Sequence, residues 1–349
     1  GGAAAALQFV NTGGTLKTLG LSGNSIYAGA STINNGVNLK LLNATAAGTG
    51  GIINNNQLDV AFNNASLTNT LTGAGSTTVS GTNVQLAGNN AGYTGAWQVN
   101  GTASVTAAQN LGTGSVALNG AASQLSVAAA AGNDYTFSNP LTGNGNIAVG
   151  MGNAADTFSF GATTGAAFTG TAALGQGTFN LANENTAALT NATLQINNNN
   201  LTKVGNGNQT INGLTFNGGM LAFTTSLPAV VVSPETVTAT NLNIVNGKVR
   251  VFIPDSQVAP AGWDGPASEN PLLQQNQVSV VKLMSTSNTS GRVQDLTLVD
   301  EHNIVVPASE QIPMTQDGMQ VAIGSYGYSL GSGAGNDGVY VTYGLVGAQ

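Results

Sequence analysis

The chain has 349 residues, of which 41% are hydrophobic, only 6% are charged and none is cysteine. Soluble domains usually have about 25% charged residues, so this protein must rely on Asn, Thr, Ser and Gln for its polar surface. The net charge of −7 disfavours a nucleic-acid partner, which would require a basic patch. The lack of cysteine excludes disulfide frameworks, thiol catalysis and cysteine-based zinc sites.

Short alternating strands separated by glycine-rich turns are clearest between Tyr93 and Gly120. Apolar residues take every second position in three short runs, Trp97 and Val99, Ala103 and Val105, and Val116 and Leu118. A two-residue period indicates strands with one buried face, and the intervening glycines permit tight turns. The pattern predicts an all-β chain built as a parallel β-solenoid. At ~20–25 residues per coil, the chain would form roughly 14–17 coils stacked about 4.8 Å apart.

Two motifs recur along the first part of the chain. LTGAG begins at Leu71 and LTGNG at Leu141, while an aromatic residue followed by Thr-Gly occurs at Tyr93 and Phe168. We expect a repeated module of roughly 70–75 residues containing about three coils. Asparagine clusters at 54–56 and 197–200 lie at turns and are expected to be structural, because Asn tolerates left-handed backbone and bonds neighbouring main chain.

The composition changes near residue 226, after which most of the prolines and charged residues occur. We therefore predict β-helix repeats over residues 1–226 and a hairpin-rich C-terminal cap over residues 227–349. A proline-rich loop without periodicity is expected at 254–277, and alternating segments after it predict antiparallel hairpins with turns at Asp300–Asn303 and Gly333–Asp337.

The segment Tyr93–Gly120 resembles the passenger-associated repeat of bacterial autotransporters, and Gly324–Leu345 is similar to the end of such passengers. The resemblance implies a right-handed parallel β-helix closed by an autochaperone-like region, exported through an outer-membrane barrel that is absent from this chain. Gly1–Val10 has no charged leader before an apolar core, so we expect a processed or excised piece located at a bacterial cell surface or secreted.

The resemblance is strongest to the self-associating, AIDA-type adhesins. Protease passengers carry a GDSGS motif, which this chain lacks, and it has a single histidine. We expect a non-enzymatic surface protein acting in aggregation, biofilm formation or host attachment. Its expected partners are identical passengers and a host-surface protein or glycan. The alternative is a glycan-binding or polysaccharide-cleaving β-helix protein, although the only arginines, Arg250 and Arg292, lie far from the acid-poor coils in sequence.

Sequence motifs for chemistry are sparse, and we predict no catalytic residues, no cofactor site and no metal site. GYSLG places Ser329 in a nucleophile position, but no helix pattern follows it and His302 precedes it in the chain. G-x-G-x-x-A patterns at Gly112–Ala117 and Gly143–Ala148 run into strands rather than helices, so turn corners explain them better than a dinucleotide site.

Possible metal ligands and sugar-stacking aromatics are equally weak. Asp156 stands alone in GMGNAADTF, whereas Ca²⁺ needs six or more oxygens, and the run Asp300 to His302 is expected at a hairpin tip. Trp97 shares the inward parity of Val99 and should be interior, while Trp263 remains open between the two roles. The tyrosines that could stack on sugars are Tyr326, Tyr328, Tyr340 and Tyr343.

Overall fold

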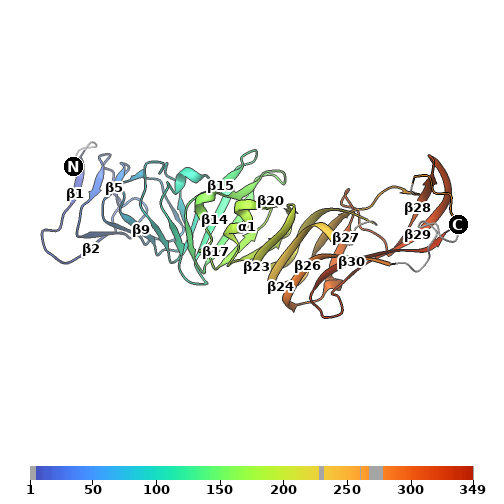
Figure 1. Ribbon diagram of the computed structural model, residues 1–349. Helices are drawn as coiled ribbons and strands as arrows, with labels where there is room; N and C mark the ends of the chain where they lie inside the picture. Colours follow the sequence, from blue (N-terminus) through green and yellow to red (C-terminus); the bar gives the residue numbers. More distant parts are fainter. Residues whose placement is uncertain (1–4, 228–231, 260, 267–277, 349) are drawn as a thin grey trace. The chain divides into compact units, whose positions relative to one another are not determined.

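The computed structural model describes residues 5–227, 232–259, 261–266 and 278–348 (Figure 1). It is nearly all-β and forms a parallel β-solenoid of about 11 turns, with antiparallel hairpin strands at the C-terminal end. The predicted fold class is therefore confirmed. The described chain has no helix that is both long enough and apolar enough to span a membrane.

Contacts divide the chain into two compact units. Unit 1 comprises Gly1–Phe179 with Asn183–Gln195, and unit 2 comprises Asn180–Ala182 with Ile196–Gln349. The predicted change at residue 226 lies inside unit 2. Parallel strand pairing continues on both sides of residue 226, because β23 (Gly207–Ser226) pairs in parallel with β24 (Val232–Phe252).

The strands of unit 1 form parallel sheets, in which each strand pairs with its counterpart on the next coil. The first sheet contains β1 (Leu7–Phe9), β3 (Ser31–Ile33), β5 (Ile52–Asn54) and β8 (Leu71–Thr72). The second contains β2 (Lys17–Leu21), β4 (Val37–Leu41), β6 (Gln57–Val60), β9 (Ser76–Val79), β11 (Trp97–Val99), β13 (Val116–Leu118) and β16 (Leu141–Gly143).

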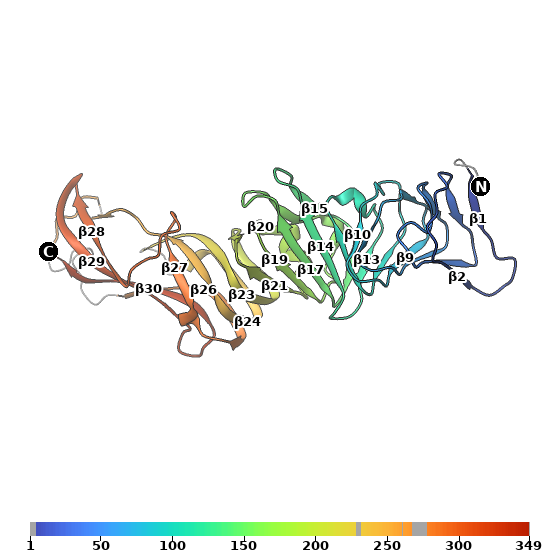
Figure 2. The same cartoon turned by 180° about the vertical axis from the view of Figure 1, so that it is seen from behind.

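A third sheet runs through β7 (Ala65–Leu67), β10 (Val84–Leu86), β12 (Thr102–Val105), β14 (Gln124–Ala129), β17 (Asn146–Met151) and β19 (Thr171–Leu174). Figure 2 shows β14, β17 and β19 following one another along it. β15 (Tyr135–Phe137) pairs with β18 (Phe158–Phe160). The remaining elements up to residue 197 are η1 (Ala108–Asn110), η2 (Ala162–Thr164), β20 (Gly177–Leu181), α1 (Asn183–Ala188) and β21 (Thr193–Asn197).

Stacked glycines allow the coils to approach each other at their corners. A Cβ atom on Gly95 would lie 1.8 Å from the carbonyl oxygen of Gly75, and one on Gly114 would lie 1.8 Å from that of Gly95. Gly170 has the same relation, at 1.8 Å, to the carbonyl oxygen of Gly145. No side chain fits at such distances, so the glycines of the aromatic-Thr-Gly and Leu-Gly-Thr-Gly motifs are required by the backbone of the preceding coil.

The recurring motifs do not mark a fixed three-coil module. Leu71 begins β8 on the first sheet, whereas Leu141 begins β16 on the second sheet. Both copies make the same contact with the following coil: Gly73 pairs with Tyr93, and Gly143 pairs with Phe168. The Leu-Thr-Gly motif therefore marks a corner, and the aromatic-Thr-Gly motif marks the residue stacked on that corner in the next coil. The two copies of this arrangement lie on different sheets of the solenoid.

Coil length explains why the chain makes fewer turns than predicted. Residues that hydrogen-bond between neighbouring coils of unit 1 are separated by 19 positions at Asn64 and Asn83 and by 25 at Ala121 and Asn146. In unit 2 the separation rises to 28 residues between Asn208 and Thr236 and to 47 between Asn241 and Asn288. The predicted coil length holds for unit 1 and for the first coil of unit 2, where Asn197 and Asn217 are 20 residues apart, but not for the later coils.

The interior of unit 1 is filled by inward side chains that stack in register from coil to coil. One column contains Leu39, Leu58, Thr77, Trp97, Val116 and Leu141, each at most 1% exposed. Trp97 is fully buried and donates its Nε1 proton to the carbonyl oxygen of Leu111 at 2.7 Å. Its predicted interior position is confirmed.

Buried asparagines connect the corners of successive coils. Asn69 donates to the carbonyl oxygens of Gly48 and Gly50 at 3.0 and 2.8 Å, and Asn139 donates to those of Gly112 and Gly114 at 3.1 and 2.7 Å. Asn110 donates to the Gly88 oxygen at 2.9 Å and accepts from the amides of Thr106 and Ala107 at 3.0 Å. These amides satisfy corner carbonyls that the short strands leave unpaired.

The asparagine cluster at 54–56 has the structural role that its sequence predicts. Asn54 is fully buried and donates to Ser76 O at 2.9 Å, and its own side-chain oxygen accepts from the Asn56 amide at 3.1 Å. The cluster at 197–200 is partly structural, since Asn199 adopts a left-handed φ of 69° at the turn between β21 and β22 (Asn200–Val204).

Unit 2 combines parallel coils with antiparallel hairpins. β24 pairs in parallel with β26 (Val278–Ser290) and with β27 (Leu296–Val299), which follows η5 (Val293–Asp295). β26 pairs antiparallel with β30 (Gly338–Ala348), β30 with β29 (Met319–Gly331), and β29 with β28 (Ser309–Gln316). The predicted antiparallel hairpins are confirmed.

The predicted C-terminal turns are also found. Asn303 donates its backbone amide to Asp300 O at 3.0 Å with a left-handed φ of 63°, and Asp337 donates to Ser332 O at 3.1 Å. Within the predicted loop 254–277, β25 (Gln257–Val258) pairs in parallel with β28. Residues 260 and 267–277 of that loop lie outside the described residues.

Substitution of a buried corner asparagine tests directly how much these hydrogen bonds stabilise the fold. Replacing Asn110 by Ala leaves the buried carbonyl oxygen of Gly88 without its partner and removes two part-buried bonds from the amides of Thr106 and Ala107, so we expect the free energy of unfolding to fall by about 1–3 kcal/mol. The exposed Asn119→Ala variant is the matched control and should change it by less than about 0.5 kcal/mol. Urea denaturation followed by circular dichroism measures both. Equal losses in the two variants would contradict the role assigned to Asn110.

Candidate polar face and the fate of the predicted site residues

The outward side chains of the second sheet form a nearly uncharged surface across consecutive coils of unit 1. We call it the polar face and define it by Asn38, Lys40, Gln57, Asp59, Ser76, Thr78, Ser80, Gln98, Asn100, Asn119 and Thr142. It arises because every second residue of these strands points outward while its neighbours fill the core.

Hydrogen bonds link the polar face from coil to coil. Asn119 donates to Gln98 Oε1 at 2.8 Å and to Asn100 Oδ1 at 3.0 Å. Ser80 donates to Asp59 Oδ1 at 2.6 Å. Such ladders hold the side chains in a regular array, and each amide or hydroxyl keeps further donor or acceptor capacity toward the solvent side.

Charge is almost absent from this surface. Lys40 and Asp59 are its only ionisable members, and they are register partners on neighbouring strands β4 and β6, while the exposed Lys17 lies on β2 at the edge of the same sheet. Their opposite charges leave the polar face without net charge, so two such faces would meet without like-charge repulsion.

Most aromatic residues that could have stacked on sugars are buried. Tyr326, Tyr328 and Tyr343 are 4%, 6% and 3% exposed. The rings of Tyr326 and Tyr343 stack with centroids 4.9 Å apart, and Tyr328 meets Tyr343 edge-on at 5.1 Å. This cluster is part of the core of unit 2. Trp263 is half-buried, and its carbonyl oxygen accepts from Gln316 Nε2 at 3.3 Å.

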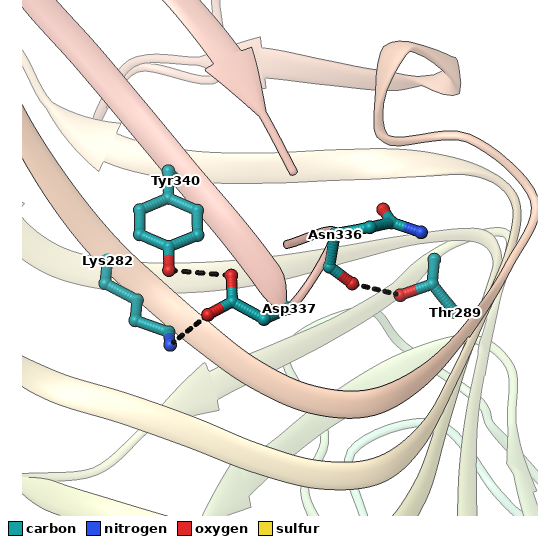
Figure 3. Close-up of polar contacts among 5 residues, drawn as sticks. All are labelled: Lys282, Thr289, Asn336, Asp337 and Tyr340. Atoms are coloured by element: carbon teal, nitrogen blue, oxygen red, sulfur yellow. Dashed lines mark hydrogen bonds and ion pairs between the residues drawn. The ribbon is translucent and has the colours of Figure 1, made fainter. Parts of the chain in front are cut away.

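Tyr340 belongs to a polar cluster that sequence reasoning missed (Figure 3). Asp337 accepts from the Tyr340 hydroxyl at 2.8 Å and pairs with Lys282 Nζ at 3.3 Å, and the ammonium lies 5.3 Å from the Tyr340 ring centroid. The Tyr340 hydroxyl and the Lys282 ammonium lower the pKa of Asp337. The cluster joins β26 to the start of β30, which are far apart in sequence and carry no shared motif.

A second link lies beside this cluster. Thr289 donates its hydroxyl to the carbonyl oxygen of Asn336 at 3.4 Å (Figure 3). Both links tie β26 to the turn between β29 and β30, so we assign them a structural role at the point where the sheet changes from parallel to antiparallel pairing.

The glycine and serine motifs are structural where they stand. Ser329 lies within β29 and its hydroxyl bonds that of Thr342 on β30, so it occupies no strand-to-helix turn. Gly112 has a left-handed φ of 66° and Gly143 one of 94°, and each sits under a carbonyl oxygen of the preceding coil. The interpretation of both G-x-G patterns as coil corners is confirmed.

The carboxylates singled out by sequence bind backbone. Asp156 Oδ2 accepts from the amides of Gly132 and Asn153 at 2.9 and 3.1 Å. Glu301 Oε2 accepts from the amide of Ile253 at 2.9 Å, and Asp300 Oδ1 caps its own turn. Across the residues that the structure describes, no group of three or more His, Cys, Asp and Glu side chains is arranged to hold a metal ion.

Comparison with known proteins identifies relatives without assigning a role. An uncharacterized lipoprotein, YdeK, of Escherichia coli (strain K12) is 32% identical over 231 residues, which cover 61% of this chain and 17% of YdeK. The uncharacterized protein YuaQ of the same strain is 31% identical over 268 residues, which cover 74% of this chain and 19% of YuaQ. The chain thus matches less than one fifth of the length of each relative. No family model and no solved structure matches it.

Two buried tyrosines should respond oppositely to loss of the hydroxyl. Tyr93 bonds Thr77 Oγ1 at 2.8 Å and the carbonyl oxygens of Ala96 and Gly75, and burial raises its pKa to about 12. The hydroxyl of Tyr135 is buried and has no hydrogen-bond partner in the described structure. Tyr93→Phe should lower the free energy of unfolding by about 1–3 kcal/mol, whereas Tyr135→Phe should leave it unchanged or raise it.

Thermal and urea unfolding of the two Tyr→Phe variants measure this difference, and each variant is the other's control because both keep the aromatic ring. A larger loss for Tyr135→Phe than for Tyr93→Phe would contradict the assigned environments.

Unit 2 should be stabilised by neutralising Glu310. Partial burial, then Asp300, Glu301 and Asp255, raise the pKa of Glu310. Because the raised pKa makes ionisation less favourable in the folded state, stability falls as the pH rises from the unfolded pKa through the folded one. Glu310→Gln should therefore raise Tm at pH 7 and have little effect at pH 4, where both states are largely protonated. A Tm gain that is equal at both pH values would overturn this explanation.

Proposed function

We propose that this chain is an adhesive module of a bacterial surface protein, which associates with identical copies through its polar face. The observation that carries the proposal is the regular, uncharged array of amides and hydroxyls on the second sheet of unit 1. A hydrogen bond contributes only about 1 kcal/mol net, so such a surface gains strength by repetition along many coils.

The repeated presentation of many molecules on a cell increases this effect. When one pair of faces meets, neighbouring molecules on the same two cells are held at high effective concentration, and weak contacts add up to stable attachment. Low charge helps because exposed charges interact over a Debye length of about 8 Å at physiological salt. We infer that the polar face replaces charged residues with amides for this reason.

We propose a location in the bacterial cell envelope. The name of YdeK describes that relative as a lipoprotein, which supports an envelope location for this chain as well. The finer proposal, a passenger segment of an AIDA-type autotransporter displayed at the surface, rests on the resemblance of Tyr93–Gly120 and Gly324–Leu345. Within it, the C-terminal region from residue 227 onward would serve the autochaperone-like role.

Charge placed on the polar face should abolish clumping. We would display the chain on non-aggregating cells and compare wild type with a triple variant, Gln57→Glu, Gln98→Glu and Thr142→Glu. These residues are outward-facing, and Gln98 and Thr142 lie two coils apart, about 10 Å. Wild-type cells should settle, and cells displaying the variant should remain suspended because the facing carboxylates repel.

The matched control places three carboxylates on every second coil of the third sheet, as Gln85→Glu, Ser126→Glu and Ala173→Glu. Cells displaying this control should settle like wild type. Absence of clumping by wild type, or equal settling by the two triple variants, would refute pairing through the polar face. Surface antibody labelling and circular dichroism establish that all three proteins are displayed and folded.

A further inference from the structure

A polar groove in unit 2 has a composition that the fold itself does not explain. Its volume is about 480 Å³, and its polar side chains are Asn198, Asn199, Asn246, Lys248, Asp295 and Thr297. They come from the turn before β22, from β24, from η5 and from β27. Amides, an ammonium, a carboxylate and a hydroxyl therefore come together in one groove, although its first and last lining residues, Asn198 and Thr297, are about 100 positions apart in sequence.

Bulges and glycines keep the floor of this groove open. The pairing of β23 with β24 shifts register between Phe216 and Asn217 and again between Asn217 and Met220. Gly218 lies at the bulge with a φ of 102°, and a Cβ atom there would be 1.8 Å from Asn198 Oδ1. Bulges commonly redirect side chains next to binding sites. Here they leave bare backbone beneath the asparagine amides.

The groove asparagines differ from those that hold the coils together. Asn69, Asn110 and Asn139 are buried, and their amides bond corner carbonyls. Asn198, Asn199 and Asn246 are exposed, and their side chains make no hydrogen bond to any residue that the structure describes. The adjacent Asn197 accepts from Asn217 at 3.0 Å, so the same corner can support an amide ladder. The groove amides are left available for another partner.

The charges of the groove are balanced and fixed. Arg292 holds Asp295 by two hydrogen bonds, from Nη2 at 3.0 Å and from Nε at 3.3 Å. These bonds lower the pKa of Asp295, so its carboxylate remains ionised at neutral and mildly acidic pH. Lys248 is the only basic residue in the lining, so the groove lacks the cluster of basic groups that a polyanion requires, and it offers no apolar pocket for a peptide side chain.

We propose that this groove binds a short segment of a neutral polysaccharide. Vicinal sugar hydroxyls each donate and accept, and they are matched by planar amides, a carboxylate and an ammonium set side by side. Lys248 supplies donors only, Asp295 supplies acceptors only, and the asparagines supply both. The inference goes beyond self-association through the polar face, which belongs to unit 1, and it gives the glycan-binding alternative from the sequence a definite location.

Saturation-transfer NMR on the full chain tests the assignment. The probes are hexasaccharides of glucose, mannose, galactose and N-acetylglucosamine, with a heparin hexasaccharide as the anionic comparator. We expect binding of at least one neutral probe at millimolar concentration and none of heparin. Asn198→Ala with Asn246→Ala, and separately Asp295→Asn, should weaken the binding at least tenfold.

The control is Asn241→Ala with Asn288→Ala, which removes two exposed amides that bond each other at 3.2 Å elsewhere in unit 2 and should bind like wild type. Binding of no neutral probe, binding of heparin alone, or unchanged binding by the groove variants would overturn the proposal. Groove variants should still clump cells, and polar-face variants should still bind sugar, so the two proposals can fail separately.

Discussion

Close approach of backbone to backbone at the coil corners is the constraint on which this structure depends. Parallel strands of successive coils are about 4.8 Å apart, and at the corners the carbonyl oxygen of one coil occupies the space where the next residue's Cβ would lie. Gly75, Gly95 and Gly114 form such a column, with distances of 1.8 Å to the virtual Cβ atoms. The corners determine where each strand starts, and the strands determine which side chains enter the core.

The sequence was informative wherever structure follows from local pattern. The alternation of apolar and polar residues identified Trp97 and Val99 as interior, and the short glycine motifs identified the corners. Both properties depend on a few neighbouring residues. The number of coils was overestimated because coil length is set by loops and long strands that have no period. The apparent module between Leu71 and Leu141 also misled, since the same local motif starts a strand on either of two sheets.

The polar groove and the Lys282 cluster could not have been found this way. Asn198 and Asp295 lie almost 100 positions apart, and their meeting depends on the register shifts between β23 and β24 and on the parallel pairing of β24 with β27. Lys282 meets Asp337 only because β26 changes from parallel to antiparallel partners. Such contacts depend on the register between distant strands, and a single sequence carries no marker of that register.

Polar residues in this protein have two distinct tasks, and the distinction explains its unusual composition. A narrow solenoid must satisfy corner carbonyls that its short strands leave free, and a buried amide such as Asn139 does so without the desolvation cost of a charge. Once amides are fixed at the corners, the same residue type can cover the outside as well. The exposed ladders then keep the protein hydrated while its surface remains nearly neutral. Recognition by such a surface depends on the spacing of its donors and acceptors, which the coil repeat sets, rather than on long-range attraction between charges.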